Sequence, residues 1–121
     1  MTDVNKVAAD YITLWNETDA DRRSQLLAEQ WTAGATYVDP LARADGAAEI
    51  GAYIGGVHQR FPEYRFALLG EANGHGDHVR FSWSLGPAGA VAPIEGSDVL
   101  TLSGGRVESV IGFLDKVPQP A

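Results

Sequence analysis

The sequence contains no cysteine, which excludes disulfide bonds, thiolate nucleophiles and cysteine-ligated metal sites. Basic residues are also scarce: nine lysines and arginines stand against 16 aspartates and glutamates, giving a net charge of −7. Because binding to a phosphate backbone rests on clustered basic side chains, we expect no nucleic-acid partner. No apolar stretch approaches the length of a membrane span, and the opening residues lack the pattern of a signal peptide. We therefore expect a cytoplasmic protein without a membrane partner.

Length and composition indicate one globular domain over residues 1–121. A chain of 121 residues is long enough to bury one core and too short for two. Hydrophobic residues make up 45% of the chain and charged residues 21%, which is typical of a folded protein.

The first half of the chain has the hydrophobic period of helices, with apolar residues recurring every three or four positions. Three helices are predicted, over Asp3–Trp15, from Asp19 or Asp21 as far as Trp31, and over Gly46–Phe61. Gly34 is expected to end the second helix and Pro62 the third. A polar link around Arg43 and Asp45 precedes the third helix.

The second half alternates or runs apolar, as strands do. Four strands are predicted, over Tyr64–Leu69, His78–Leu85, Val91–Leu102 and Arg106–Val117. Glycine-rich turns at 73–77, 86–89 and 103–105 separate them, and such short turns join antiparallel hairpins. Helices followed by a meander predict an α+β fold, with the helices packed on one face of a curved, mostly antiparallel sheet.

Asp39 ends a short β-branched and aromatic run and is followed at once by Pro40. Proline cannot continue a strand ladder, and it restricts the backbone of the residue before it. The carboxylate is therefore held at the end of a rigid element, where a scaffold can present a reactive group. An alternative remains open: aspartates before turns often accept hydrogen bonds from their own turn and have no other role.

Asp98 shares a predicted strand face with Leu100 and Leu102. Because these leucines favour burial of that face, we expect a buried carboxyl whose pKa is raised by desolvation. Such a group is a candidate functional residue, although buried structural carboxyls also occur.

Three helices, a strand ending in Asp-Pro and a long meander resemble the nuclear transport factor 2-like superfamily, whose cone-shaped fold encloses a pocket. Within it, three segments are similar to the ketosteroid isomerases: Tyr11-Ile12-Thr13-Leu14, Val38-Asp39-Pro40-Leu41 and Asp98-Val99-Leu100-Thr101-Leu102. The resemblance implies that Asp39 is a proton-shuttling base and that Tyr11 and a neutral Asp98 donate to an oxyanion. It also implies a pocket for a small apolar ligand, with no cofactor. The residues we expect to line this pocket are Trp15, Ile54, His58, Phe66, Phe81, Trp83, Leu100, Val110 and Leu114.

Some features of the chain depart from that pattern or favour other members of the superfamily. The segment between Tyr11 and Asp39 is a few residues longer than in the isomerases. Phe81-Ser82-Trp83 and Gly112-Phe113-Leu114-Asp115 are similar to polyketide cyclase-like and uncharacterised members. The Arg-x-Asp pair of the limonene epoxide hydrolases is incomplete, because Ser82 stands two residues after Arg80.

His75, Asp77 and His78 form a histidine-rich turn that could be read as part of a metal site. They lack a third well-spaced ligand outside the turn, so we interpret them as a solvated hairpin and expect no metal.

Two functional hypotheses follow. One is a cofactor-free acid–base enzyme, an isomerase or cyclase acting on a small, largely apolar carbonyl compound. The other is a non-catalytic module that uses the same cavity for ligand binding or dimerisation. In either case we expect a homodimer, because the outer face of such a sheet retains apolar residues.

Overall fold

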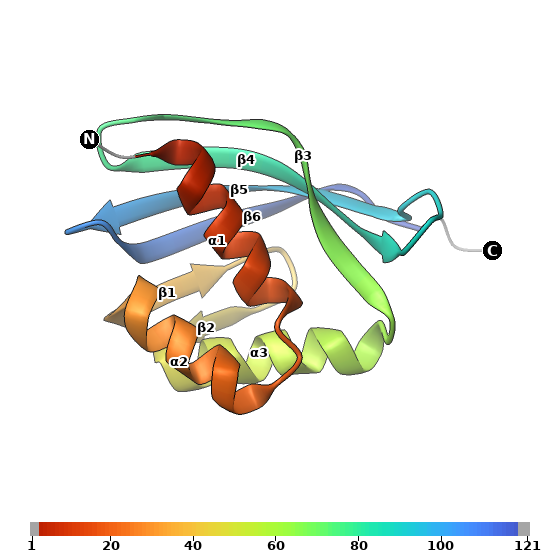
Figure 1. Cartoon of the computed structure of the whole chain (residues 1–121), viewed down its shortest axis with the longest axis horizontal. Helices are drawn as coiled ribbons and strands as arrows, with labels where there is room; N and C mark the ends of the chain where they lie inside the picture. Colours follow the sequence, from red (N-terminus) through yellow and green to blue (C-terminus); the bar gives the residue numbers. More distant parts are fainter. Residues whose placement is uncertain (1–2, 119–121) are drawn as a thin grey trace.

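The structure, a computed structural model, describes residues 3–118 of the chain (Figure 1). The helices are α1 (Val4–Asn16), α2 (Ala20–Gln30) and α3 (Gly46–Arg60). The strands are β1 (Trp31–Val38), β2 (Arg43–Asp45), β3 (Tyr64–His75), β4 (His78–Pro87), β5 (Ile94–Ser103) and β6 (Arg106–Lys116).

The strands form one six-stranded curved sheet in the order β2-β1-β6-β5-β4-β3. β1 runs parallel to β6, and the other neighbouring pairs are antiparallel. All three helices lie on the same side of the sheet: α1 crosses it diagonally, and α2 and α3 lie toward β1 and β2 (Figure 1). The predicted α+β architecture is thereby confirmed.

Local signals set the start of the first two helices. Asp3 caps α1 by accepting a hydrogen bond from Lys6 N at 3.1 Å, and Asp19 caps α2 by accepting one from Asp21 N at 2.9 Å. These side chains satisfy backbone donors that have no partner within the helix. On α1, Tyr11 and Trp15 lie on the buried face one turn apart, so both point toward the sheet.

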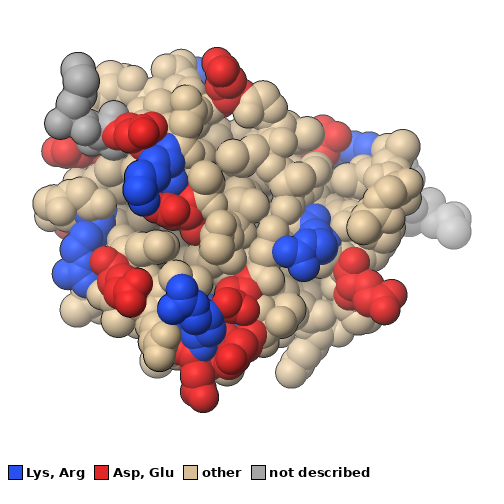
Figure 2. Space-filling view, viewed as in Figure 1, with Lys and Arg blue, Asp and Glu red and all other residues tan. Residues whose placement is uncertain are grey.

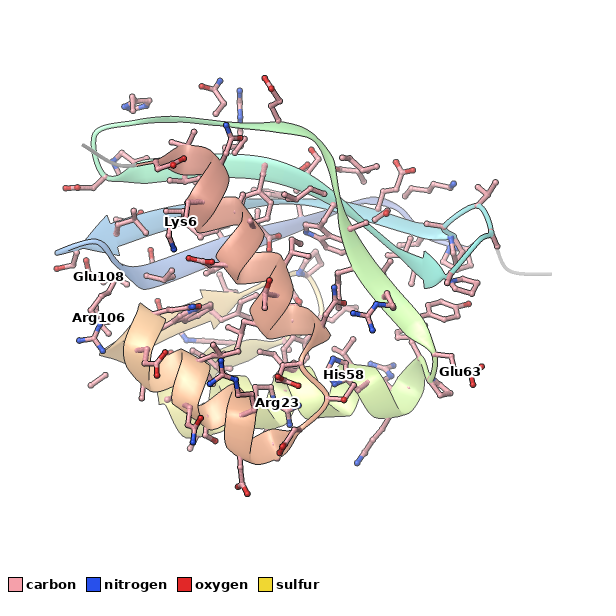
Figure 3. All side chains as sticks on the ribbon, viewed as in Figure 1. Lys6, Arg23, His58, Glu63, Arg106 and Glu108 are labelled. Carbon is pink, nitrogen blue, oxygen red and sulfur yellow. The ribbon has the colours of Figure 1, made fainter. Side chains whose placement is uncertain are left out.

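The C-terminal end of α1 is fixed from two sides. The Asn16 side chain exchanges two hydrogen bonds with the backbone of Phe66 on β3, at 2.8 and 2.9 Å. From α3, His58 points toward this end of α1, and its Nε2 donates to the Trp15 carbonyl oxygen at 2.6 Å (Figure 3). These contacts hold the Trp15 backbone against both α3 and β3.

The boundary between α2 and β1 differs from the sequence prediction. The helix ends at Gln30, and Trp31 is the first residue of the strand, with its side chain 2% exposed. Its ring stacks on Tyr11 at 6.0 Å, so tertiary packing draws this residue out of the helix. Gly34 therefore ends no helix. It lies inside β1, where the register with β6 shifts between Trp31 and Thr36.

Two further boundaries differ. The link around Arg43 and Asp45 is the strand β2, which pairs with the end of β1 through Val38↔Arg43 and Thr36↔Asp45. Strand β3 extends past Leu69 to His75, because Gly70 at φ +70° and a register shift carry it into a second stretch of pairing with β4. Smaller differences of one to three residues occur at the ends of α1, α3, β4, β5 and β6.

Charged side chains of both signs are intermixed on the face of the molecule that carries the helices (Figure 2). Among the residues that the structure describes, no helix is long and apolar enough to cross a membrane.

Candidate functional site

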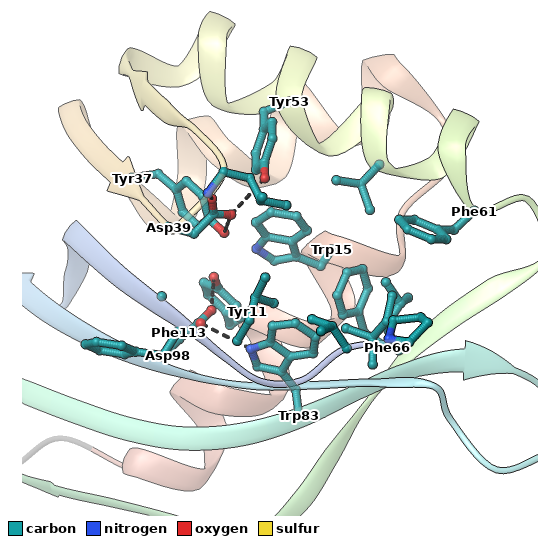
Figure 4. Close-up of a pocket in the computed structure, with 18 residues that line it drawn as sticks. Tyr11, Trp15, Tyr37, Asp39, Tyr53, Phe61, Phe66, Trp83, Asp98 and Phe113 are labelled. Carbon is teal, nitrogen blue, oxygen red and sulfur yellow. Dashed lines mark hydrogen bonds between the residues drawn. The ribbon is translucent and has the colours of Figure 1, made fainter. Parts of the chain in front are cut away.

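A cavity of about 200 Å³ lies between the helices and the concave face of the sheet (Figure 4). Its wall is largely apolar, with eight aromatic residues among the 18 that line it, and contains two carboxyl groups. The lining residues are Tyr11, Trp15, Tyr37, Asp39, Leu41, Tyr53, Val57, Phe61, Phe66, Trp83, Leu85, Ile94, Asp98, Gly112, Phe113, Leu114, Val117 and Pro118. The cavity is smaller than the about 300–1,000 Å³ of pockets for drug-sized ligands, so it suits a small molecule.

Asp98 lies in the middle of β5 and is 3% exposed, on the same buried face as Leu100 and Leu102. This confirms the orientation predicted from strand alternation. Its Oδ2 accepts a hydrogen bond from Tyr11 Oη at 2.5 Å, and its Oδ1 accepts one from Trp83 Nε1 at 3.1 Å (Figure 4). The carboxyl is thus held by α1 on one side and by β4 on the other.

Burial raises the pKa of Asp98 to about 6. The two hydrogen bonds act in the opposite direction, since they stabilise the charged form, while the negative charges of Asp39 and Asp115 raise the pKa further. Burial and the charge of Asp98 also raise the pKa of Tyr11 well above its ordinary value, so the phenol keeps its proton. At neutral pH, Asp98 is therefore a carboxyl that changes protonation state easily.

The position of the Trp83 indole depends on a glycine. Trp83 pairs with Gly96 across β4 and β5, and a methyl group added at Gly96 would overlap the six-membered ring of Trp83. The absence of a side chain at Gly96 lets the indole lie flat against β5 and place its N–H on Asp98.

Asp39 follows the last residue of β1, and its two oxygens have different surroundings. Oδ1 accepts hydrogen bonds from the backbone N–H groups of Leu41 and Ala42, at 2.8 and 2.9 Å. Oδ2 accepts hydrogen bonds from the hydroxyls of Tyr37 and Tyr53, both at 2.7 Å (Figure 4). Both interpretations of Asp39 therefore have a structural basis: one oxygen organises the turn and the other belongs to the cavity wall.

The two tyrosines remain protonated beside this carboxylate. Burial raises the pKa of Tyr37, and the negative charge of Asp98 and the hydrogen bond to Asp39 raise it further. For Tyr53, burial again comes first and the hydrogen bond to Asp39 second. Both phenols therefore act as donors to Asp39.

Gly112 on β6 brings the two carboxyl groups to one place. A methyl group added there would lie 2.9 Å from Asp98 Oδ1, 3.4 Å from Asp39 Cβ and 3.6 Å from the Tyr37 hydroxyl. Gly112 is also the strand partner of Asp98. Both acids can thus approach the same point of β6 because no side chain occupies it.

The structure brings together Tyr11, Asp39 and Asp98, the three residues predicted to be catalytic, around this cavity. Of the nine residues predicted to line it, four do: Trp15, Phe66, Trp83 and Leu114. The other five lie elsewhere.

Ile54, Phe81, Leu100 and Val110 are at most 3% exposed and belong to the core behind the cavity wall. Strand alternation correctly places Phe81, Leu100 and Val110 on the inner face of the sheet. It does not show which part of that face is covered by α1 and which part borders the cavity. His58 does not line the cavity because its ring is used to bond the Trp15 carbonyl.

Tyr37 and Tyr53 are the partners that sequence reasoning missed. Tyr37 precedes Asp39 by two residues, so strand alternation offered a signal for their shared face. Tyr53 lies 14 positions from Asp39 on another element, and its position in the apolar stripe of α3 suggested only a core residue.

His75 and His78 pair at the end of the β3–β4 hairpin, with their rings 5.5 Å apart. Within residues 3–118, no group of three or more histidine, aspartate or glutamate side chains is arranged to hold a metal ion.

Comparisons with known proteins agree with this architecture. The family model of the SnoaL-like domain matches residues 8–110. A candidate isomerase of the SnoaL-like family from Agrobacterium tumefaciens is 41% identical and has a TM-score of 0.90, with 95% of this chain and 99% of that one covered. No match is found among curated proteins.

Two more distant solved structures share the fold. A candidate ketosteroid isomerase from Kribbella flavida has a TM-score of 0.71 at 18% identity, with 98% of this chain and 82% of that one covered. A candidate polyketide cyclase from Sinorhizobium meliloti has a TM-score of 0.72 at 19% identity, with 91% and 95% covered.

Proposed function

The chain belongs to the SnoaL-like family, and on this basis we propose that its cavity carries out cofactor-free acid–base chemistry on a small, largely apolar carbonyl compound, of the isomerase or cyclase type. The observation that carries the proposal is the pair of carboxyl groups with unlike surroundings, Asp39 and Asp98, in one aromatic cavity. Pairs of acids whose environments separate their protonation behaviour allow one to act as base while the other acts as acid.

In this proposal Asp39 removes a proton from the carbon next to the carbonyl group. Its Oδ2 already accepts two phenol hydrogen bonds, so taking up the proton requires one tyrosine hydroxyl to turn away. The four donors around Asp39 hold its carboxyl group in place, and the apolar lining that includes Trp15 and Phe66 limits the access of water to the reacting carbon.

Tyr11 and Asp98 stabilise the carbonyl oxygen as it becomes negative. When Asp98 is neutral, this pair holds two protons: one joins the two residues and the other can be donated to the substrate oxygen. When Asp98 is ionised, the single Tyr11 proton is used within the pair. The neutral form of Asp98 is therefore the active one.

A second candidate, a non-catalytic ligand-binding module, is favoured by the fact that each oxygen of both carboxyl groups already accepts at least one hydrogen bond from the protein. Hydrogen–deuterium exchange distinguishes the two. Small cyclic ketones and enones that shift the melting temperature are incubated with the protein in D₂O, and NMR follows the loss of the α-proton signal. Exchange faster than in buffer supports the enzyme; binding without exchange supports the module.

We also propose that the protein is a homodimer formed through the outer face of the sheet. Val38, Ile111 and Val99 are consecutive cross-strand neighbours on β1, β6 and β5, and Phe113 continues this apolar surface. Ile111 and Phe113 are 49% and 52% exposed. Analytical ultracentrifugation should show a dimer for the wild type and for Leu69→Lys on β3, and a monomer for Ile111→Lys. A monomeric wild type at micromolar concentration would refute this part.

A further inference from the structure

The cavity contains negative charge without a positive counterpart. Its lining includes Asp39 and Asp98 but no lysine, arginine or histidine. The ion pairs within the described part of the chain are Lys6–Asp10 and Arg43–Asp45, and neither involves these two carboxyl groups. Arg60 slightly lowers the pKa of Tyr53, but its side chain is exposed and does not line the cavity.

The hydrogen-bond donors of the wall are already used, with one exception. Tyr11 and Trp83 donate to Asp98, and Tyr37 and Tyr53 donate to Asp39. A ligand anion would therefore meet two carboxylates and no free hydroxyl or ammonium donor.

The exception is the Trp15 indole N–H. Trp15 is 4% exposed, and its Nε1 is the one buried side-chain nitrogen or oxygen within residues 3–118 that has no hydrogen-bond partner. Its N–H lies near enough to the Tyr11 hydroxyl to lower the pKa of that phenol, against the larger effect of burial. Figure 4 shows the nitrogen edge of this indole turned toward the space between Asp39 and Tyr11. A buried donor without a partner is costly, so a ligand that brings an acceptor oxygen to this place is favoured.

The aromatic rings of the wall are inclined to one another. Trp15 lies 5.4 Å from Tyr37 at 45° and 6.1 Å from Tyr53 at 89°, while Phe66 and Trp83 are 5.4 Å apart at 69°. Rings at these distances pack against one another, so a ligand lies beside them and not between them, and because the ring planes differ in direction it meets aromatic surface on more than one side. Ring faces carry negative charge density and attract organic cations.

We propose that the cavity binds a small ammonium compound that also carries an oxygen acceptor, with its charge facing Asp39, Asp98 and the aromatic rings and its oxygen facing the Trp15 N–H. A methylated ammonium group suits an apolar wall, since it presents no N–H donors that require partners. The inference extends to ligands beyond the carbonyl compounds of the proposed function, and it does not require that either aspartate transfers a proton.

The charge of Asp98 makes this binding depend on pH. The titratable groups that face Asp98 are Tyr11 from α1, Tyr37 and Asp39 from β1 and its end, and Asp115 from β6. None of them carries a positive charge, so a bound cation would stabilise the ionised form of Asp98. Affinity for the cation should therefore increase as pH rises through about 6.

The test compares choline with 3,3-dimethylbutan-1-ol, its neutral analogue of the same shape, by isothermal titration calorimetry at constant ionic strength. At pH 8, choline should bind the wild-type protein about tenfold more tightly than the alcohol. At pH 5 this preference should shrink several-fold. Equal affinity for the two compounds, tighter binding of the alcohol, or no measurable binding of choline would overturn the proposal.

Single-residue variants show which side chains cause the preference for choline over the alcohol. Asp98→Asn should make the preference for choline over the alcohol independent of pH. Asp39→Asn should reduce this preference at both pH values. Asp77→Asn, on the exposed hairpin turn, should change neither the preference nor its pH dependence. Trp15→Phe should weaken choline more than tetramethylammonium, which has no oxygen. A preference unchanged in both cavity variants, with their fold verified by circular dichroism, would refute the proposal. If the protein prefers choline but does not exchange α-protons, the cation proposal is supported and the enzyme proposal is contradicted. If it exchanges α-protons but shows no preference for choline, the enzyme proposal is supported and the cation proposal is contradicted.

Discussion

Trp83 lies directly against Gly96, its cross-strand partner, and this contact aims the indole N–H at Asp98. The site therefore depends on a residue that contributes no functional group. A side chain at Gly96 has to displace the indole, because the backbone of Phe113 closes the other side.

We expect Gly96→Ala to destabilise the protein by about 1–3 kcal/mol, since the added methyl group overlaps Trp83 in a packed wall. Urea unfolding gives the free energy of unfolding. Gly56→Ala is the matched control: it lies in α3 with open space around it, and alanine favours helix, so this variant should be as stable as the wild type or slightly more so. Equal effects of the two substitutions would show that the Trp83 contact is loose.

The second prediction concerns stability against pH. The folded-state pKa of Asp98 is about 6, above the ordinary value of 3.8, so the folded protein holds a proton that the unfolded chain releases. Asp98 therefore lowers the free energy of unfolding as pH rises from about 4 to about 6, and the full penalty of about 3 kcal/mol persists above that range.

Asp98→Asn removes this titration. Relative to the wild type, the variant should gain stability between pH 4 and pH 8, by up to about 3 kcal/mol. Urea unfolding at several pH values measures the difference, and Asp77→Asn serves as the control at an exposed carboxyl. A difference between variant and wild type that does not change with pH would contradict a raised pKa for Asp98.

The third prediction concerns Asp39. Asp39→Asn retains the size of the side chain but removes its capacity to accept a proton. Turnover should fall by a factor on the order of 10² or more on any carbonyl substrate found. Stability should fall by about 1 kcal/mol, because an amide nitrogen replaces the oxygen that accepts two phenol hydrogen bonds.

Tyr53→Phe separates these effects, since it removes one hydrogen bond to Asp39 and leaves the carboxylate in place. It should lose similar stability and keep most of the turnover. If Asp39→Asn loses stability but no turnover, Asp39 serves only the turn formed with Leu41 and Ala42.

The fourth prediction is a pH–rate profile. Because the proposed active form has a neutral Asp98, kcat/KM should decline above pH of about 6, approaching a tenfold loss per pH unit. In the Asp98→Asn variant this decline of kcat/KM at higher pH should disappear, and a rate lower than that of the wild type should remain. A rate that instead rises through pH 6 would assign Asp98 as the base and contradict the roles given to the two acids.

The sequence predicted those features that depend on local periodicity. Alternation with Leu100 and Leu102 was sufficient to bury Asp98, and the Asp-Pro corner was sufficient to place Asp39 at a strand end. The boundary at Trp31 was wrong because stacking on Tyr11, 20 positions earlier in the chain, outweighs helix continuation. Likewise, no local signal shows that Tyr53 bonds Asp39, or that α1 covers Phe81 and leaves Trp83 open to the cavity.

At Gly112 only backbone atoms of β6 lie beside the side chains of Asp39 and Asp98. The residue at this position is therefore a marker for the chemistry of related proteins. Every other amino acid inserts at least a carbon atom between Asp98 and Asp39. A relative with alanine or serine at this position keeps the strand and its hydrogen bonds, yet the carboxyl that corresponds to Asp98 must shift, because the added carbon would lie 2.9 Å from its Oδ1. Members of the family can therefore be sorted by this residue into those in which an acid at the position of Asp98 can lie against β6 as it does here and those in which it must take another orientation.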